Sequence, residues 1–282
     1  MLHFCKLVQH RSLTGYYKYS SPVAGSQEYV KNYTMHLKRI HLGSVGSTNG
    51  ILSERVKSAP AREEMVVIAD YQENGRGQGD HHWHSDPGEN LLMSVLLYPA
   101  FLSASDQFHL SRVTSLALCD TLKRMKQRPW IKWPNDILVS GRKIAGILIE
   151  NGITGLELSH SILGIGLNLN QRQFPDFPVP ATSLVLETGN RKDPGEAADW
   201  LLEAIEVRYH QLESGSVASL EEEYLEHLYL LDQPGGFISK GVQFTGIIRG
   251  VNEYGELLVE SEGVTRSYGF QQIQYSVPGD QN

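Results

Sequence analysis

Short apolar runs alternate with longer helical patterns along residues 35–232. Residues 65–71 and 90–99 are rich in Val, Ile, Leu and Met, and they predict buried strands. Residues 106–127 repeat apolar side chains at helical spacing, with Asp106 as a candidate N-cap. This alternation predicts an α/β unit.

Turn signals divide the rest of this unit. Residues 131–152 predict a hairpin with Ser140–Gly141 in its turn, and residues 156–170 predict a strand. Two helices are expected over about 193–212 and 219–231. The first begins with an Asp-Pro pair, which supplies an N-cap and a favoured first helical residue.

The composition changes after residue 232, where Gln-Pro-Gly-Gly begins a different pattern. Only short strand patterns follow, separated by Gly and Asn turns, and they predict a small β barrel over residues 235–277. Residues 1–34 show neither pattern: they carry four basic residues against one acid and no apolar core of a secretory signal. They suit a transit peptide, a disordered extension or a start codon assigned upstream of Met35.

Composition excludes several classes of protein. The formal net charge is −7 and the pI is near 5.9, so a broadly basic nucleic-acid surface is not expected. The two cysteines, Cys5 and Cys119, exclude a disulfide scaffold and suit a reducing, cytoplasmic compartment. The longest apolar stretch, residues 91–104, is too short and interrupted to span a membrane.

The first chemical motif is the glycine-rich sequence YQENGRGQGDHHW at residues 71–83. Its glycines let a backbone approach an anion closely, and Arg76 adds a planar cation that suits a carboxylate or phosphate. A dinucleotide fingerprint does not fit, because Asp and Pro residues break any following helix. An ordinary flexible surface loop is the alternative. The three histidines at 81, 82 and 84 lack supporting metal-site spacing, so no metal held by protein ligands is expected.

The second motif, KWPNDILVSGRKIAGIL at residues 132–148, brings an acid toward a base. In a hairpin that turns at Ser140–Gly141, Leu138 faces Lys143, so Asp136 lies diagonally from Lys143 on the same face unless a bulge intervenes. The two residues form either a surface ion pair of little energetic value or a catalytic pair whose lysine neutralises an anion.

Two shorter motifs complete the set. In GIGLNLN, Gly164, Gly166 and Asn168 share one face of a strand, and this bare strip makes room for a ligand or for another backbone. In SVGSTN, Ser47 can cap the following helix, and with the next two residues it offers polar groups to a ligand ring.

In this order the motifs resemble those of the biotin–protein ligase family. The matching positions are Ser47, Thr48, Asn49, Gln72, Gly75, Arg76, Gly77, Trp83, residues 132–136, Arg142, Lys143, residues 146–148, Gly164, Gly166 and Asn168. The resemblance spans about residues 37–275. It implies a mixed central sheet flanked by helices, like the catalytic domain of class II aminoacyl-tRNA synthetases, followed by an SH3-like β barrel.

The resemblance also implies an ATP-dependent ligase of the biotin–[acetyl-CoA-carboxylase] ligase type. Biotin and ATP would form biotinyl-5′-adenylate, with Mg²⁺ carried by ATP, and a lysine of a biotin carboxyl carrier domain would then accept the biotinyl group. The implied catalytic residues are Lys143, Arg76 and Asp136. The implied biotin contacts are Ser47, Thr48, Asn49, Gln72, Gly75, Arg76, Gly77, Gln78, Lys143, Gly146, Gly164 and Gly166. The implied ATP contacts are Arg76, Trp83, Lys132, Asn135 and Asn168.

The glycine loop departs from the family pattern, because Gly79 and Asp80 stand where Arg and Gly are usual. An acid there should weaken the attraction of phosphate. Some family members carry an N-terminal winged helix that represses transcription. Residues 1–34 lack helical periodicity, so no operator binding is expected, and no membrane binding either. Homodimers of the family pair the edges of their central sheets, which this sequence alone does not test.

Two alternatives stay open. A lipoate or octanoate transferase would use a similar scaffold, but the polar side chains at Ser47, Thr48 and Gln72 exceed what a lipoyl pocket needs. A non-catalytic biotin-binding or sensing protein is supported only by the altered Gly79–Asp80.

Overall fold

The computed structural model describes residues 35, 37–58, 62–79 and 81–276. The predictions for residues 1–34, for Asp80 and for the last position of the small unit lie outside these residues.

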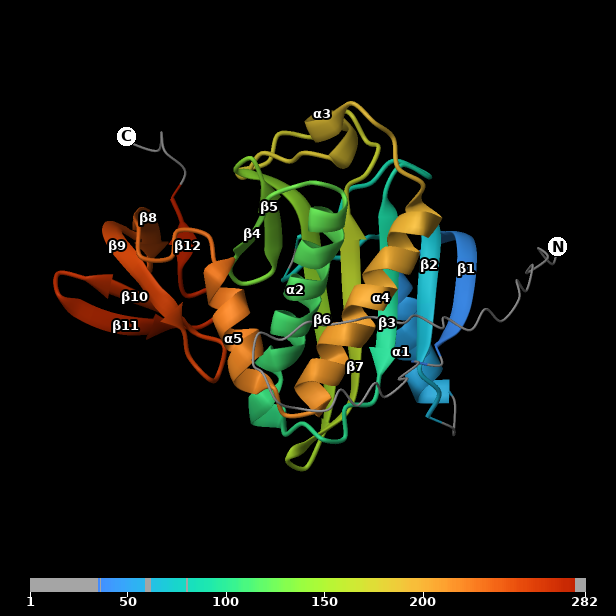
Figure 1. Ribbon diagram of the computed structural model, residues 1–282, viewed down its shortest axis with the longest axis horizontal. Coiled ribbons are helices and arrows are strands. Elements are labelled where there is room, and N and C mark those ends of the chain that lie inside the picture. The colour runs from blue at the N-terminus through green and yellow to red at the C-terminus, as the bar shows by residue number, and fades with distance from the viewer. Residues whose placement is uncertain (1–34, 36, 59–61, 80, 277–282) are drawn as a thin grey trace, which may run out of the picture.

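A seven-stranded mixed sheet forms the centre of the molecule (Figure 1). In spatial order its strands are β1 (Lys38–Val45), β2 (Met65–Gln72), β3 (Leu91–Leu97), β7 (Glu157–Leu167), β6 (Arg142–Thr154), β5 (Asp136–Val139) and β4 (Pro129–Lys132). β1 and β2 are parallel, and the other neighbours are antiparallel. All seven residues of β3 are buried, as the apolar run predicts for a strand covered on both faces.

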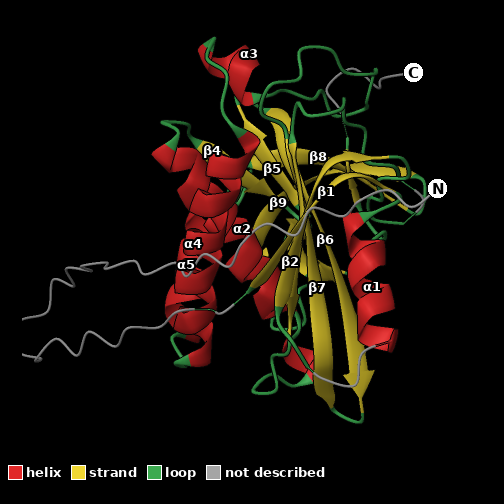
Figure 2. Cartoon of the chain, turned by 90° about the vertical axis from the view of Figure 1, so that its right-hand side faces the viewer, coloured by secondary structure: helices red, strands yellow, loops and turns green. Residues whose placement is uncertain are grey.

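Helices cover both faces of this sheet (Figure 2). α2 (Phe108–Arg124), α4 (Pro194–Glu213) and α5 (Val217–Glu226) lie on one side, and α1 (Thr48–Ser58) lies on the other. The short α3 (Leu184–Thr188) lies beyond one end of the sheet. None of the described helices is long and apolar enough to cross a membrane.

A smaller, antiparallel sheet follows α5. Its strands, in spatial order, are β11 (Val264–Tyr268), β10 (Leu257–Ser261), β9 (Val242–Val251), β8 (Pro234–Ser239) and β12 (Gln274–Tyr275). The indole Nε1 of Trp133, at the end of β4, donates to the Gly255 carbonyl at 2.9 Å, and the Trp133 ring contacts that of Phe270 at 5.5 Å. The Trp133–Gly255 hydrogen bond and the Trp133–Phe270 ring contact connect the small sheet to the large one. The mixed α/β class is confirmed, whereas the SH3-like description and the domain boundaries stay predictions.

The expected hairpin is confirmed as β5 and β6. Ser140 and Gly141 have φ of 51° and 73°, the left-handed pair that a tight hairpin turn requires. Leu138 pairs with Lys143 as predicted, but the register shifts between Ile137 and Leu138, so a bulge does intervene.

Two helix details differ from the sequence prediction. Asp106 is not the N-cap of α2: it lies in a 3₁₀ turn (Ala104–Asp106), where its carboxylate accepts from Ser103 Oγ at 2.7 Å, and Gln107 takes the cap position. The second acidic helix ends at residue 226, because the next residues bond to β4: Ile131 N–H donates to the His227 carbonyl at 2.7 Å.

Candidate active site

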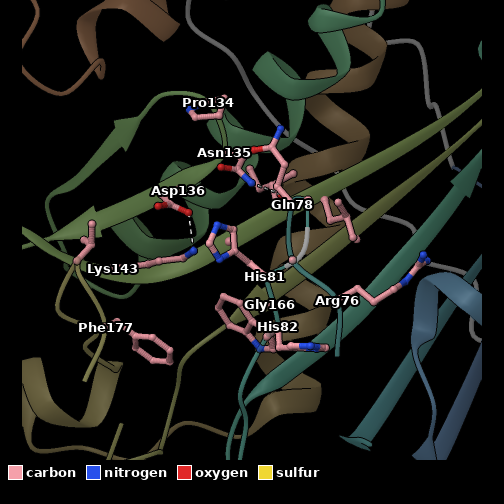
Figure 3. Close-up of a pocket in the computed structure, with 18 of the residues that line it drawn as sticks. Arg76, Gln78, His81, His82, Pro134, Asn135, Asp136, Lys143, Gly166 and Phe177 are labelled. Atoms are coloured by element: carbon pink, nitrogen blue, oxygen red, sulfur yellow. Dashed lines mark hydrogen bonds and ion pairs between the residues drawn. The ribbon is translucent and has the colours of Figure 1, made fainter. Parts of the chain in front are cut away.

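One pocket of about 870 Å³ lies where the glycine loop, β6, β7 and the small sheet meet (Figure 3). Nearly all of the predicted site residues line it. They are Ser47, Thr48, Asn49, Gln72, Arg76, Gly77, Gln78, Trp83, Lys132, Asn135, Asp136, Lys143, Gly146, Gly164, Gly166 and Asn168. The exception is Gly75, which is buried within the loop and does not line the pocket.

In the glycine-rich loop, residues 75–77 and 81–83 pair as the two arms of a narrow hairpin. Trp83 N–H donates to the Gly75 carbonyl at 2.9 Å, and Gly77 N–H donates to the His81 carbonyl at 2.7 Å. A Cβ at residue 75 would lie 2.5 Å from the Trp83 carbonyl oxygen. This glycine therefore allows the two arms of the hairpin to approach, a role that anion binding alone did not suggest.

The Trp83 side chain fills the bare strip on β6 and β7. A Cβ at Gly166 would lie 2.3 Å from the indole ring, and one at Gly146 would lie 2.8 Å from it. Side chains, rather than a ligand or a second backbone, thus occupy the predicted strip: Trp83 covers Gly166, and a Cβ at Gly164 would lie 2.3 Å from Asn49 Oδ1. Trp83 also lines the pocket. Among the described residues the buried Trp83 Nε1 has no hydrogen-bond partner, so it can donate to a bound molecule.

A cluster of three charges lies beside the Trp83 ring, with Lys143 Nζ 5.6 Å from the ring centre. Asp136 Oδ1 is 2.6 Å from Lys143 Nζ, and Asp136 Oδ2 is 3.6 Å from Lys132 Nζ. The predicted Asp136–Lys143 contact is therefore present in spite of the bulge. Burial lowers the pKa of Lys132, and the Lys143 charge lowers it further, while Asp136 acts in the opposite direction. With both lysines charged, the cluster holds a net positive charge, which suits an anion.

Arg76 is the predicted catalytic residue that lies farthest from this arrangement. Its guanidinium points away from the Asp136–Lys143 pair (Figure 3) and forms an ion pair with Glu150 Oε2 at 2.7 Å. The Arg76 side chain is 45% exposed. It would have to leave Glu150 to reach an anion held by the lysines.

A polar network joins the SVGSTN segment, residues 44–49, to the strand β3 on which it packs. Ser94 Oγ, in the otherwise apolar β3, lies 2.6 Å from Thr48 Oγ1 and 2.5 Å from Asn49 Oδ1. Thr48 N–H and Oγ1 both donate to Gln72 Oε1. Asn49 Nδ2 donates to Glu150 Oε2 at 2.7 Å. Thr48 and Asn49 line the pocket, but they use these groups to fix its floor.

The two predicted ATP-contacting asparagines are also held by the backbone. Asn135 Nδ2 donates to the Ile147 carbonyl at 2.9 Å, and Asn168 Nδ2 donates to the Thr182 carbonyl at 3.0 Å. The buried Asn168 Oδ1 has no partner among the described residues, so it remains able to accept a hydrogen bond.

Two segments of the pocket were not predicted from the sequence. The first is the loop over residues 174–181, which brings Phe174 and Phe177 to the rim and is joined to β6 where Lys143 N–H donates to the Pro180 carbonyl. The second runs over residues 271–275 of the small sheet. Neither carries a motif, because each acquires its place only through the tertiary fold.

No group of three or more His, Cys, Asp or Glu residues gathers in an arrangement that could hold a metal ion within the described ranges.

Comparison with known proteins agrees with the geometry. Residues 42–168 match the model of the biotin/lipoate A/B protein ligase family. The biotin–[acetyl-CoA-carboxylase] ligase of Paracoccus denitrificans is 32% identical over 230 residues, which cover 77% of this chain and 92% of that protein. The chain belongs to the biotin protein ligase family.

Other members of the biotin protein ligase family match as well. The biotin protein ligase of Aquifex aeolicus, in complex with biotin and ATP, superposes with a TM-score of 0.70 at 26% identity and covers 84% of this chain and 97% of that one. The bifunctional ligase/repressor BirA of Escherichia coli K12 is 27% identical over 227 residues, or 79% of this chain and 70% of its own length.

Proposed function

We propose that the protein joins biotin to a lysine of a biotin carboxyl carrier domain in an ATP-dependent reaction. The observation that carries this proposal is the convergence of separate sequence motifs on one pocket, with two lysines placed around one aspartate. Family membership supports the reaction, and relatives named biotin–[acetyl-CoA-carboxylase] ligase support acetyl-CoA carboxylase as the source of the carrier domain.

In the first step, a carboxylate oxygen of biotin attacks the α-phosphorus of ATP. The acyl–phosphate bond of biotinyl-5′-adenylate forms, the bond to the β-phosphate breaks, and pyrophosphate leaves. Both reactants are anions, so catalysis consists mainly of neutralising and aligning them. Lys143 is assigned to the meeting point of carboxylate and α-phosphate, and Lys132 to a neighbouring phosphate oxygen. Magnesium would arrive with the ATP phosphates.

Polar groups on the other walls of the pocket are assigned to binding the ligands. Ser47, Thr48 and Gln72 face the pocket near α1, where polar groups suit the ureido ring of biotin. Asn168 Oδ1 and Trp83 Nε1 offer one free acceptor and one free donor. Both groups belong to residues that line the pocket, and this position supports a role in binding a polar ligand.

In the second step, the ε-amine of the carrier lysine attacks the acyl carbon of the adenylate. An amide bond forms, the acyl–phosphate bond breaks and AMP leaves with its electron pair, and the amine passes one proton to the Asp136 carboxylate. Asp136 is assigned to orienting the amine, because its carboxylate lies between the two lysines of the cluster. Closure of the glycine hairpin would exclude water, which would otherwise hydrolyse the anhydride.

Mass spectrometry of the carrier domain tests the proposal. The protein is incubated with biotin, MgATP and a recombinant biotin carboxyl carrier domain, and a carrier whose acceptor lysine is replaced by arginine is the control. We expect one biotinyl group on the unmodified carrier and none on the control. A carrier that gains no mass would reject the reaction.

Substituting lipoate or octanoate for biotin in the same assay distinguishes a biotin ligase from the alternative lipoate or octanoate transferase. The polar side chains near α1 favour biotin, so modification should be strongest with biotin. Preferential transfer of octanoate to a lipoyl domain would instead assign the chain to the lipoate branch of its family. Adenylate formation without transfer to any carrier would indicate a sensing protein.

A further inference from the structure

The small sheet contributes an aromatic ring to the charge cluster of the pocket. Tyr275 lies on β12, and the ammonium of Lys132 sits 4.7 Å from the centre of its ring. This distance is within the range of a cation–π contact. The ring itself is fixed, because it packs against Phe237 at 5.4 Å and against Tyr229 at 6.4 Å.

The two lysines of the cluster therefore have similar surroundings. Each contacts Asp136, and each faces an aromatic ring from a different part of the chain. Lys143 lies 5.6 Å from the centre of the Trp83 ring of the glycine hairpin, and Lys132 faces Tyr275 of the small sheet. An ammonium group placed between a carboxylate and the face of a ring is fixed in orientation as well as attracted by charge.

Lys132 needs such a contact more than Lys143 does. Its side chain is 15% exposed, against 29% for Lys143, and its distance to the shared carboxylate is 1.0 Å longer, at 3.6 Å against 2.6 Å. Lys143 also repels it. Lys132 is a buried cation whose carboxylate partner is also paired with Lys143, so it requires further stabilisation. The negative face of a desolvated aromatic ring supplies it.

We propose that Tyr275 is a positioning residue for adenylation: its ring face holds the Lys132 ammonium toward the phosphate end of the pocket. The small sheet then takes part in the first chemical step through Lys132, without touching the reacting atoms. This inference rests on the proposed ligase function and extends it to a residue with no place in the sequence motifs.

The contribution of the Tyr275 ring can be measured separately from that of its hydroxyl. Its oxygen is buried and has no hydrogen-bond partner among the described residues. Removing it should therefore cost little, because no protein hydrogen bond is lost. Tyr275→Phe keeps the ring face, Tyr275→Leu removes it, and 3,4,5-trifluorophenylalanine at the same position keeps the shape while weakening the negative face.

The first experiment measures pyrophosphate release with biotin and MgATP for the full chain. Tyr275→Phe should equal the unmodified protein, Tyr275→Leu should lose about 3- to 30-fold in kcat/KM for ATP, and the fluorinated ring should fall between them. Phe244→Leu, which removes a ring that packs against Phe237 and Tyr268 within the small sheet, is the matched control. Equal rates for the phenyl, fluorinated and leucine variants would overturn the proposal.

The second experiment does not depend on activity. The ring current of Tyr275 should shift the ε-CH₂ protons of ¹³C-labelled Lys132 upfield, with the resonance assigned by its loss in Lys132→Arg. The shift should persist in Tyr275→Phe and vanish in Tyr275→Leu. Absence of an upfield shift in the unmodified protein would refute the contact. A shift in a protein that releases no pyrophosphate would support the contact and reject the ligase instead.

Discussion

The two sides of the pocket are built in different ways. Lys132, Asp136 and Lys143 stand on β4, β5 and β6, where ion-pair distances of 3.6 and 2.6 Å join each lysine to the carboxylate. Arg76 stands on the glycine hairpin, is half-exposed, and forms its ion pair with Glu150, outside the charge cluster. One side is preorganised, and the other must exchange a partner before it can contribute.

This difference assigns the two sides to different parts of the reaction. A preorganised cluster lowers the barrier of the chemical step, because it needs no rearrangement when charge develops. A hairpin that leaves an ion pair to bind substrate contributes mainly to affinity and to exclusion of water. Changes on the strand side should therefore lower kcat, and changes on the hairpin side should alter KM.

The strongest test of the preorganised side is Lys143→Ala. Loss of the cation at the meeting point of two anions should reduce adenylate formation by about 10²- to 10³-fold. Pyrophosphate release measures the rate, and circular dichroism checks that the fold is retained. Lys57→Ala, at an exposed position of α1, is the control. Turnover unchanged by the substitution would remove Lys143 from the mechanism.

Gly166→Ala attacks the junction between the two sides. The new Cβ would lie 2.3 Å from the Trp83 ring and would force the hairpin away from β7. Overpacking of this kind costs about 1–3 kcal/mol. Because that energy displaces the hairpin from its place in the pocket, we expect activity to fall about 5- to 150-fold. Gly43→Ala is a matched control, because a Cβ there meets no atom within 4 Å. If both variants behave alike in thermal unfolding and in adenylate formation, then packing of the Trp83 ring against Gly166 is not required for either.

A smaller effect is expected for Ser94→Ala on the floor of the pocket. The substitution removes the Ser94 hydroxyl from Asn49 Oδ1 and from Thr48 Oγ1, while the bonds of Thr48 to Gln72 and of Asn49 to Glu150 remain. It should cost about 1–3 kcal/mol in the free energy of unfolding, with less than a tenfold rise in KM for biotin. Denaturant unfolding gives the free energy. Ser115→Ala is the control, since the buried Ser115 hydroxyl has no partner among the described residues. Equal losses from both variants would show that the floor network adds no stability.

Ser94 also illustrates what the sequence could predict. Local patterns predicted the strands, the hairpin turn and the Asp136–Lys143 contact, because these depend on neighbours along one or two strands. Ser94 is a polar residue in an apolar strand, and that inconsistency alone could have marked it. Glu150 and Tyr275 carry no such mark: their partners Arg76 and Lys132 are 74 and 143 positions away in the numbering of the chain, so only the folded sheets bring them together.

The smallest expected effect, and the most direct test of the hairpin side, comes from Glu150→Gln. The amide can still accept from Asn49 but no longer holds Arg76 by charge. Because exposed ion pairs contribute only about 0.2–1 kcal/mol, we expect KM for ATP or biotin to fall about two- to fivefold, with kcat nearly unchanged. The gain should shrink as salt screens the pair in the unmodified protein. Glu260→Gln, which removes a comparable surface partner from Arg249, should leave both parameters unchanged. A fall in kcat with KM constant would instead place Glu150 with the preorganised side, as a support for Asn49 rather than a competitor for Arg76.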